Sequence, residues 1–151
     1  MTVYLVRHAD ALGRSVWTHD DVLRPLTEKG FEQAQGLVEL WGGKGITRLL
    51  ASPAVRCRQT LDPLASHLGL VIEDTDALLE GAPVEGARAL RESVMALDVA
   101  RGSHGDLIPD LVNRLIAEGM EAHGRDAKKG STWVLDHDGK RFVRGRYEPA
   151  P

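Results

Sequence analysis

Cysteine is nearly absent from this sequence, in which Cys57 is the one cysteine among 151 residues. A single cysteine cannot form an internal disulfide, and its spacing to the histidines does not match that of structural zinc sites. The sequence therefore predicts a fold that depends on a hydrophobic core, and we expect no bound metal.

Long apolar runs and a strong excess of one charge are also missing. No segment approaches the ~18 consecutive apolar residues of a membrane span, and the first residues lack the pattern of a secretion signal. The formal net charge is -3, with 42% hydrophobic and 27% charged residues, which disfavours a nucleic-acid polymer or a membrane surface as partner. We expect a single domain over residues 1–151, located in the cytoplasm. The sequence carries no signal of oligomeric state.

Short apolar runs alternate with segments of helical periodicity. A polar loop, residues 11–26, separates the first strand from the first helix and is expected to lie over the end of that strand. This order predicts an α/β three-layer sandwich, with a central mainly parallel sheet, helices on both faces and a C-terminal hairpin. The strands are expected at residues 3–6, 46–51, 70–72, 98–105 (interrupted by polar residues), 132–135 and 141–143, and the helices at 27–41, 55–68, 87–97 and 107–116.

Polar side chains with matching chemistry follow three of these strands. Arg7 and His8 come directly after the first strand, Arg56 follows the second, and His104 ends the interrupted one. If these strand ends converge, as they do in open α/β sheets, the pocket between them is strongly electropositive. Guanidinium groups match the oxygens of a phosphoryl group, so the implied ligand is a phosphate. Taken alone, Arg7 and His8 would be interpreted more simply as a solvated strand end.

The order of these motifs resembles the histidine phosphatase superfamily, which has the phosphoglycerate mutase-like fold. The matching segments are Arg7-His8-Ala9, residues 24–34, residues 52–60 and Ser103-His104-Gly105, and the resemblance is to the short, SixA-like branch. Within it, residues 108–111 and 129–135 are similar to the phosphatase-like C-terminal half of two-domain bacterial Nudix hydrolases. The sequence has no Nudix box, so only that half would be represented.

The resemblance implies a role for each motif residue. His8 would be the nucleophile, forming a phosphohistidine intermediate that water hydrolyses. Arg7, Arg56 and His104 would hold the phosphoryl oxygens in the ground and transition states. This mechanism requires neither a metal nor a cofactor.

The general acid for the leaving oxygen has several candidates. Glu80 is the first choice, because other members of the superfamily place their acid in the corresponding connection. Asp10 and Asp106 lie next to the two histidines in the sequence, and either could substitute. If the substrate is phosphohistidine, the leaving imidazole needs less help from an acid than an alkoxide does.

Other residues have simpler interpretations. Arg58 points about 200° around the helix from Arg56 and is expected on the surface or in a salt bridge. Arg101 is expected at an exposed strand edge, with a second phosphate contact as the alternative, and Phe31 is expected to pack on the apolar face of its helix. No site role is predicted for His19, His67, His123 and His137.

Two substrate classes remain open. A phosphohistidine protein suits the compact size of the chain, whereas a nucleotide or another phosphorylated small molecule suits the likeness to the Nudix-linked half. In the loop 11–26, Trp17, Arg14 and Arg24 could contact a nucleotide, or Trp17 could pack on its own loop. The alternative function is a catalytically silent phosphate-binding or regulatory module.

Overall fold

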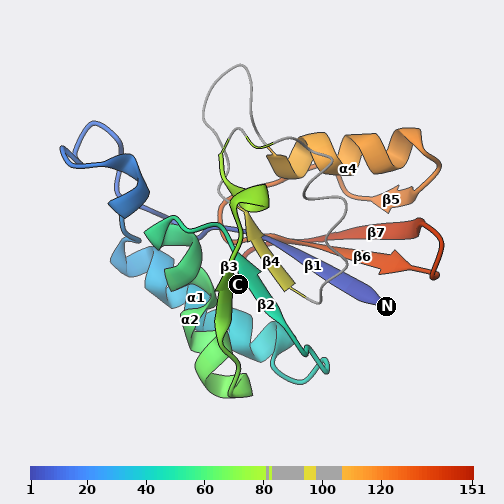
Figure 1. Cartoon of the computed structure of the whole chain (residues 1–151), viewed down its shortest axis with the longest axis horizontal. Helices are drawn as coiled ribbons and strands as arrows, with labels where there is room; N and C mark the ends of the chain where they lie inside the picture. Colours follow the sequence, from blue (N-terminus) through green and yellow to red (C-terminus); the bar gives the residue numbers. More distant parts are fainter. Residues whose placement is uncertain (81, 83–93, 98–106) are drawn as a thin grey trace.

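The central feature of the fold is a mixed β-sheet. The computed structural model describes residues 1–80, 82, 94–97 (backbone only) and 107–151. Within these residues the sheet has seven strands in the order β3-β2-β4-β1-β6-β7-β5 (Figure 1). The strands are β1 (Thr2–Arg7), β2 (Leu49–Ala51), β3 (Ile72–Asp74), β4 (Val94–Leu97), β5 (Glu121–His123), β6 (Thr132–His137) and β7 (Phe142–Glu148).

Neighbouring strands from β3 to β1 are parallel, and β6 is antiparallel to both β1 and β7. The expected mainly parallel sheet with a closing hairpin is therefore confirmed. The short strand β5 pairs in parallel with β7 at the other edge. Because β1, β2 and β4 run in the same direction, their C-terminal ends meet at one edge of the sheet.

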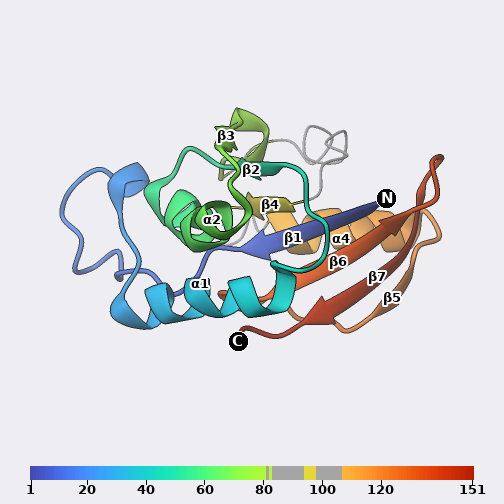
Figure 2. The ribbon, with the colours of Figure 1, turned by 90° about the horizontal axis from the view of Figure 1, so that it is seen from below.

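Helices lie on both faces of this sheet (Figures 1 and 2). On one face, α1 (Glu28–Trp41) and α2 (Val55–Leu68) pack over Tyr4 and Val6 of β1, and on the other α4 (Leu107–Ala117) packs over Val3 and Leu5. The alternation of β1 side chains between the two cores is the two-residue period of a strand buried on both sides. Two short 3-10 helices, η1 (Asp21–Leu23) and η2 (Asp76–Leu78), lie in the connections.

The bounds of helix α1 follow from residues that the sequence shows at each end. Thr27 caps its N-terminus, where the Thr27 side chain accepts a hydrogen bond from the Gly30 N–H at 3.1 Å, and Gly42 follows its last residue. A Cβ on Gly30 would lie 2.0 Å from the carbonyl oxygen of Asp10. The start of α1 therefore approaches the chain after β1 so closely that only glycine fits.

The helix expected at residues 87–97 is wrong at its C-terminal end. Val94–Leu97 form strand β4, an inner strand of the sheet between β1 and β2. Four consecutive apolar residues suit a strand buried on both faces better than the one-sided stripe of a surface helix. The strand expected at residues 98–105 lies outside the described residues.

Smaller differences concern single positions. Phe31 is 45% exposed, so its expected packing role is wrong. The strand expected at residues 70–72 begins two residues later, and the loop after α4 contains the unpredicted strand β5. No helix among the described residues has the length and apolarity to cross a bilayer.

Candidate active site

His8 lies at the C-terminal end of β1, and 3% of it is exposed. Its Nδ1 is 2.8 Å from the carbonyl oxygen of Ala9. A carbonyl oxygen only accepts hydrogen bonds, so Nδ1 is the nitrogen that carries the proton. The other ring nitrogen, Nε2, is therefore unprotonated and carries the lone pair of the ring.

The electrostatic surroundings keep His8 neutral. The pKa of His8 is lowered to about 3, chiefly by burial; the hydrogen bond to Ala9 acts in the opposite direction, and the charges of Arg56, Arg7 and Lys129 act in the same direction as burial. An unperturbed histidine has a pKa near 6.5. At neutral pH the His8 ring is therefore an uncharged base in a positively charged setting.

The backbone around His8 is held by the chain that leads into β6. The Gly130 N–H donates to the His8 carbonyl oxygen at 3.1 Å, and the Arg7 N–H donates to the Ser131 carbonyl oxygen at 3.0 Å. The Arg7 side chain reaches the same segment, because its Nη1 donates to the carbonyl oxygen of Ala127. These bonds fix the end of β1, and with it the position of the imidazole.

Helix α2 is tied to the same strand end through Thr60. The Ala9 N–H donates to the Thr60 hydroxyl oxygen at 2.9 Å, and that hydroxyl donates to the carbonyl oxygen of Arg56 at 2.7 Å. The residue before Thr60, Gln59, accepts a hydrogen bond from the Leu26 N–H at 2.9 Å. Through these hydrogen bonds, residues of the 52–60 motif fix α2 against the end of β1 and the loop 11–26.

Arg56 lies in the first turn of α2 and is fully buried. Its Nη1 donates to the Asp21 carbonyl oxygen at 2.8 Å, and its Nη2 donates to Asp21 Oδ2 at 3.0 Å. The same Nη2 is 3.6 Å from Glu80 Oε2. The predicted phosphate-binding arginine is thus surrounded by two carboxylates.

Asp21 is a site residue that the sequence did not reveal. Burial disfavours its ionised form, but a hydrogen bond from Arg24 and the charges of three neighbouring arginines outweigh burial and lower the pKa of its carboxyl. Arg24 Nε donates to Asp21 Oδ1 at 3.0 Å, and Arg14 Nε is 3.6 Å from the same oxygen. The signal in the sequence that could have indicated this role was an acidic residue in the loop 11–26, which was expected to lie over the end of the strand that carries Arg7.

The loop 11–26 that carries these residues extends beyond the end of β1 (Figure 2). Its base is closed by a bridge between Ala11 and Leu26, and Arg24 Nη1 donates to the carbonyl oxygen of Leu12 at 2.7 Å. Trp17 packs within the loop, where its Nε1 donates to the Asp20 carbonyl oxygen at 2.9 Å and its ring contacts His19. The loop brings Arg14, Asp21 and Arg24 to the site.

Glu80, the first candidate for the general acid, lies at the edge of this network. Arg14 Nη2 donates to both oxygens of its carboxylate, at 2.9 and 3.2 Å. Together with Arg56, Arg14 therefore places Glu80 in an ion-paired environment beside the predicted phosphate pocket. Its catalytic role stays a prediction.

Asp10 contacts the start of α1. The Thr27 hydroxyl donates to Asp10 Oδ2 at 2.7 Å, and the Asp10 N–H donates to Gln33 Oε1 at 2.9 Å. The other carboxylate oxygen is 3.7 Å from Lys129 Nζ. These contacts anchor the loop after β1. They give no indication that Asp10 transfers a proton.

The remaining predicted residues divide into two groups. His104, Asp106 and Arg101 lie outside the described residues. Arg58 forms a surface ion pair with Asp74, as expected. Among the described residues there is no group of three or more His, Cys, Asp or Glu side chains suited to a metal ion.

A basic cleft adjoins the site at the same edge of the sheet. We call it the lysine cleft; its volume is about 480 Å³. It contains four cationic side chains and one carboxylate, and Lys29 has no side-chain partner within the described part of the chain. It is lined by Arg7, Asp10, Lys29, Gln33, Lys128, Lys129, Tyr147, Pro149 and Ala150.

Known proteins share both the sequence pattern and the fold. The model of the histidine phosphatase superfamily (branch 1) matches residues 3–137. An 8-oxo-(d)GTP phosphatase of Mycolicibacterium smegmatis (strain ATCC 700084 / mc(2)155) is 33% identical over 156 residues, covering 99% of this chain and 48% of the relative. GpmB of Yersinia pestis (strain Pestoides F), which carries the name of a phosphoglycerate mutase, is 29% identical over 120 residues, or 73% of this chain and 54% of that protein. The chain thus spans about half the length of these relatives.

Two solved structures have the same fold over nearly the whole chain. The protein histidine phosphatase SixA complexed with tungstate superposes with a TM-score of 0.72 at 23% identity, covering 99% of this chain and 95% of that one. The SixA protein of Agrobacterium tumefaciens gives a TM-score of 0.66 at 25% identity, with coverage of 90% and 91%. The predicted α/β architecture is confirmed by both.

Proposed function

Since the chain belongs to the histidine phosphatase superfamily (branch 1), we propose that it hydrolyses phosphate compounds with His8 as the nucleophile. The observation that carries this proposal is the state of His8. The ring is buried and neutral, and its single proton is on Nδ1, which donates a hydrogen bond to the Ala9 carbonyl oxygen. A nucleophilic histidine needs a deprotonated, oriented nitrogen, and these contacts supply one.

The reaction proceeds in two displacements at phosphorus. In the first, the His8 Nε2 lone pair forms the N–P bond while the P–O bond to the leaving group breaks, and the leaving oxygen takes that electron pair. In the second, a water oxygen attacks phosphorus, the N–P bond breaks and its electron pair returns to Nε2. The released inorganic phosphate takes one proton of the water, and the other passes to solvent. His8 is neutral again at the end of the cycle.

Positive charge beside His8 supports both displacements. Arg7 and Arg56 flank the imidazole, and their charges act on its pKa. Guanidinium donors stabilise the charge that gathers on the phosphoryl oxygens in the transition state. By resemblance His104 would complete this set, and Glu80 would serve leaving groups that need a proton.

Arg56 must exchange partners when substrate binds. Its Nη1 and Nη2 now donate to Asp21, and Nη2 is also 3.6 Å from Glu80. A phosphoryl group that reaches Arg56 therefore competes with these carboxylates for the guanidinium. The loop 11–26 carries Asp21, so we propose that this loop moves as substrate enters.

The lysine cleft supports a phosphate chain as the substrate. A phosphomonoester places its one anionic group at His8, whereas a nucleoside di- or triphosphate has further phosphates that need cations nearby. The cleft offers Lys29, Lys128 and Lys129 next to Arg7, with Asp10 as the only carboxylate lining it in the described part of the chain. The name of the Mycolicibacterium relative points to the same class.

A phosphate leaving group also suits the ion-paired state of Glu80. Cleavage of a phosphoanhydride releases a phosphate or diphosphate, which is a stable anion and needs little protonation as it departs. Glu80 accepts two hydrogen bonds from Arg14, and a leaving group that needs no general acid is compatible with this pairing. We therefore propose a nucleoside di- or triphosphate as substrate, with phosphohistidine protein as the class to be tested against it.

Trapping the intermediate tests this function. We expect the protein, mixed with a radiolabelled nucleoside triphosphate and quenched in alkali, to carry a phosphoryl group that is stable to base and lost in acid. The same experiment with a nucleoside diphosphate, a sugar phosphate and a phosphohistidine protein ranks the substrate classes by rate of labelling. Binding of every compound without labelling or phosphate release would instead identify a silent phosphate-binding module.

The lysine cleft makes a separate prediction about selectivity. An exposed ion pair contributes about 0.2–1 kcal/mol, so the double variant Lys29→Ala/Lys128→Ala should lower kcat/KM for a nucleoside triphosphate relative to p-nitrophenyl phosphate by roughly three- to tenfold. The change should lie mainly in KM. Lys140→Ala, in the turn between β6 and β7, is the matched control. An equal effect on both substrates would contradict the assignment of the cleft but not the role of His8.

A further inference from the structure

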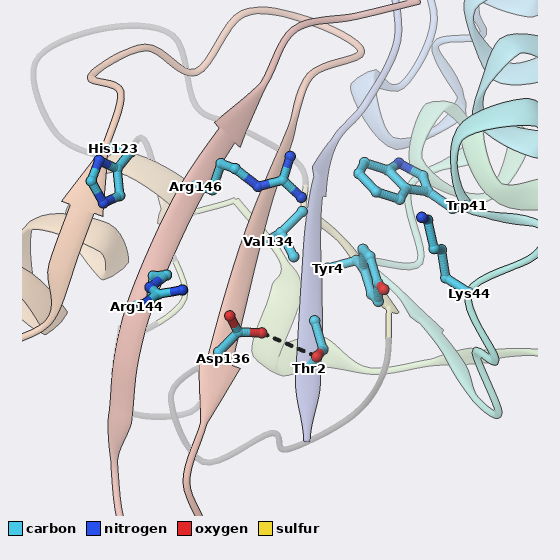
Figure 3. Close-up of a pocket in the computed structure, with 9 residues that line it drawn as sticks. All are labelled: Thr2, Tyr4, Trp41, Lys44, His123, Val134, Asp136, Arg144 and Arg146. Atoms are coloured by element: carbon cyan, nitrogen blue, oxygen red, sulfur yellow. Dashed lines mark hydrogen bonds between the residues drawn. The ribbon is translucent and has the colours of Figure 1, made fainter.

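A second basic pocket lies on the open part of the sheet, beyond the C-terminal end of α1 (Figure 3). Its volume is about 420 Å³, and we call it the sheet-face groove. It begins at Thr2, roughly 17 Å along β1 from Arg7 at 3.3 Å per residue, so it is distinct from the site at His8. The groove is lined by Thr2, Tyr4, Trp41, Lys44, His123, Val134, Asp136, Arg144 and Arg146.

Cations line both walls of this groove. Arg144 and Arg146 lie two residues apart on β7, so both side chains project from the same face of the sheet, and Lys44 faces them from the chain that follows α1 (Figure 3). Neither Lys44 nor Arg144 has a side-chain hydrogen bond or ion pair within the described part of the chain. Arg146 Nη1 is paired with Glu148 at 2.8 Å.

Asp136 is the one carboxylate that lines the groove in the described part of the chain, and Glu148 lies beside it as the partner of Arg146. Asp136 lies on the floor, where it accepts a hydrogen bond from the Thr2 hydroxyl at 3.1 Å. His123 lines the far side and is 3.2 Å from Glu121. Lys44 and Arg144 are therefore the cations of the groove that no carboxylate in the described part of the chain neutralises, and their charge favours an anionic occupant.

The aromatic residues of the groove do not offer a stacking surface. Tyr4 and Trp41 are 7% and 4% exposed, and their rings pack against each other with centroids 5.0 Å apart. The Trp41 Nε1 already donates to the Thr132 hydroxyl at 3.2 Å. A nucleobase would find no open ring face here, so the charges alone determine what binds.

We propose that the sheet-face groove binds an extended acidic segment of a partner protein, with carboxylates at every second residue. Alternate residues of an extended chain are about 6.6–6.8 Å apart, which is also the spacing of Arg144 and Arg146 along β7. A segment lying beside β7 therefore pairs two of its carboxylates with these arginines. Lys44, on the opposite wall, meets a third carboxylate and gives the segment a contact on its other side.

A short peptide provides the direct measurement. We expect a fluorescein-labelled peptide containing Glu-Ser-Glu-Ser-Glu to bind the intact chain in an anisotropy titration at low salt, and to bind at least tenfold more weakly when salt is raised to 0.3 M. The variant Arg144→Ala/Arg146→Ala should raise the Kd about fivefold or more. Arg141→Ala, an exposed arginine between β6 and β7, is the matched control and should change the Kd less than twofold.

Two further comparisons decide the identity of the occupant. A peptide with the same composition but another order, Glu-Glu-Ser-Ser-Glu, should bind more weakly, because no two of its carboxylates lie two residues apart. Equal binding of the two peptides would overturn the alternate spacing, and binding unaffected by Arg144→Ala/Arg146→Ala would overturn the groove as the site. Inorganic triphosphate that shifts the Trp41 indole N–H resonance more strongly than the peptide would show that a small phosphate occupies the groove, and this result would also overturn the proposal.

Discussion

His8→Ala should lower phosphate release on the order of 10⁴-fold or more, because the variant lacks the atom that forms the bond to phosphorus. The loss should fall on kcat rather than on KM, since Arg7 and Arg56 remain to bind the phosphoryl group. Rapid-quench labelling should show no base-stable phosphoryl group on this variant. His67→Ala, which removes an exposed histidine from the last turn of α2, is the control and should retain full activity. Phosphate release that survives in His8→Ala would contradict the mechanism.

The protonation state of His8 can be measured without a substrate. Because burial and the neighbouring cations lower its pKa to about 3, the ring should stay neutral from pH 8 down to about pH 4, where an ordinary histidine with a pKa near 6.5 is already charged. The ring resonances assigned by comparison with His8→Ala should therefore not shift across this range in an NMR titration. A titration midpoint near pH 6.5 would show that the ring is solvated and that the desolvated environment described above is wrong.

The same pKa difference affects folding. The folded pKa of His8 lies below its unfolded value, so the unfolded chain binds more protons between these two values, and His8 lowers the free energy of unfolding progressively as the pH falls below about 6.5. Above that pH it has no such effect. A buried neutral histidine thus costs some stability in acid, which is consistent with a position selected for chemistry rather than for packing.

Local sequence signals predicted the elements that carry the site. Thr27 and Gly42 bound α1, and Gly69 follows α2 in the left-handed conformation that glycine favours, so both helices end where their caps indicate. The first strand was recognisable because its apolar run stops at Arg7. The positions of Arg7, His8 and Arg56 at one edge of the sheet followed from the parallel order of the strands.

The elements that the sequence misplaced depend on contacts between distant segments. Val94 and Leu97 fit a helical stripe with Ala87 and Leu90, yet the gap between β1 and β2 is filled by a strand at Val94–Leu97. Local spacing cannot distinguish a buried strand from a helix face over so few residues. Strand β5 has only three residues, two of which are polar and exposed, so it lacks the apolar pattern by which a strand is predicted.

The ion pairs of Arg56 with Asp21 and Glu80 could not be predicted from the sequence, because they also depend on contacts between distant segments. Asp21 is 35 residues from Arg56 in the sequence, and it reaches the guanidinium only because the loop 11–26 is closed at its base by Ala11 and Leu26. The sequence predicted that Arg7 and Arg56 follow strand ends on the same side of the sheet, but it gave no sign that Asp21 pairs with Arg56. The charge of the site is consequently asymmetric: carboxylates cover Arg56, while the lysine cleft on the Arg7 side has mainly cations.

Arg56→Lys should lower kcat/KM for any phosphate substrate about 10- to 100-fold, although it keeps the positive charge. Lysine offers a single ammonium in place of the planar fork, so it cannot hold two phosphoryl oxygens at once. Loss of one transition-state donor typically costs 10²–10³ in rate, and the retained charge should recover part of that. Steady-state kinetics with p-nitrophenyl phosphate and a nucleoside triphosphate measure the effect.

Arg58→Lys is the matched control, because Arg58 is two residues away on the same helix and pairs with Asp74 on the surface. It should retain activity within about twofold, since an exposed ion pair contributes less than about 1 kcal/mol. Arg56→Ala is less informative on its own, because truncating this fully buried side chain also leaves a cavity and so lowers the free energy of unfolding. If Arg56→Lys keeps full activity while Arg58→Lys does not, the phosphate-binding arginine of α2 has been misassigned. If both variants keep full activity, the phosphoryl group is held by the Arg7 side of the site alone, and Asp21 and Glu80 remain on Arg56 throughout the reaction.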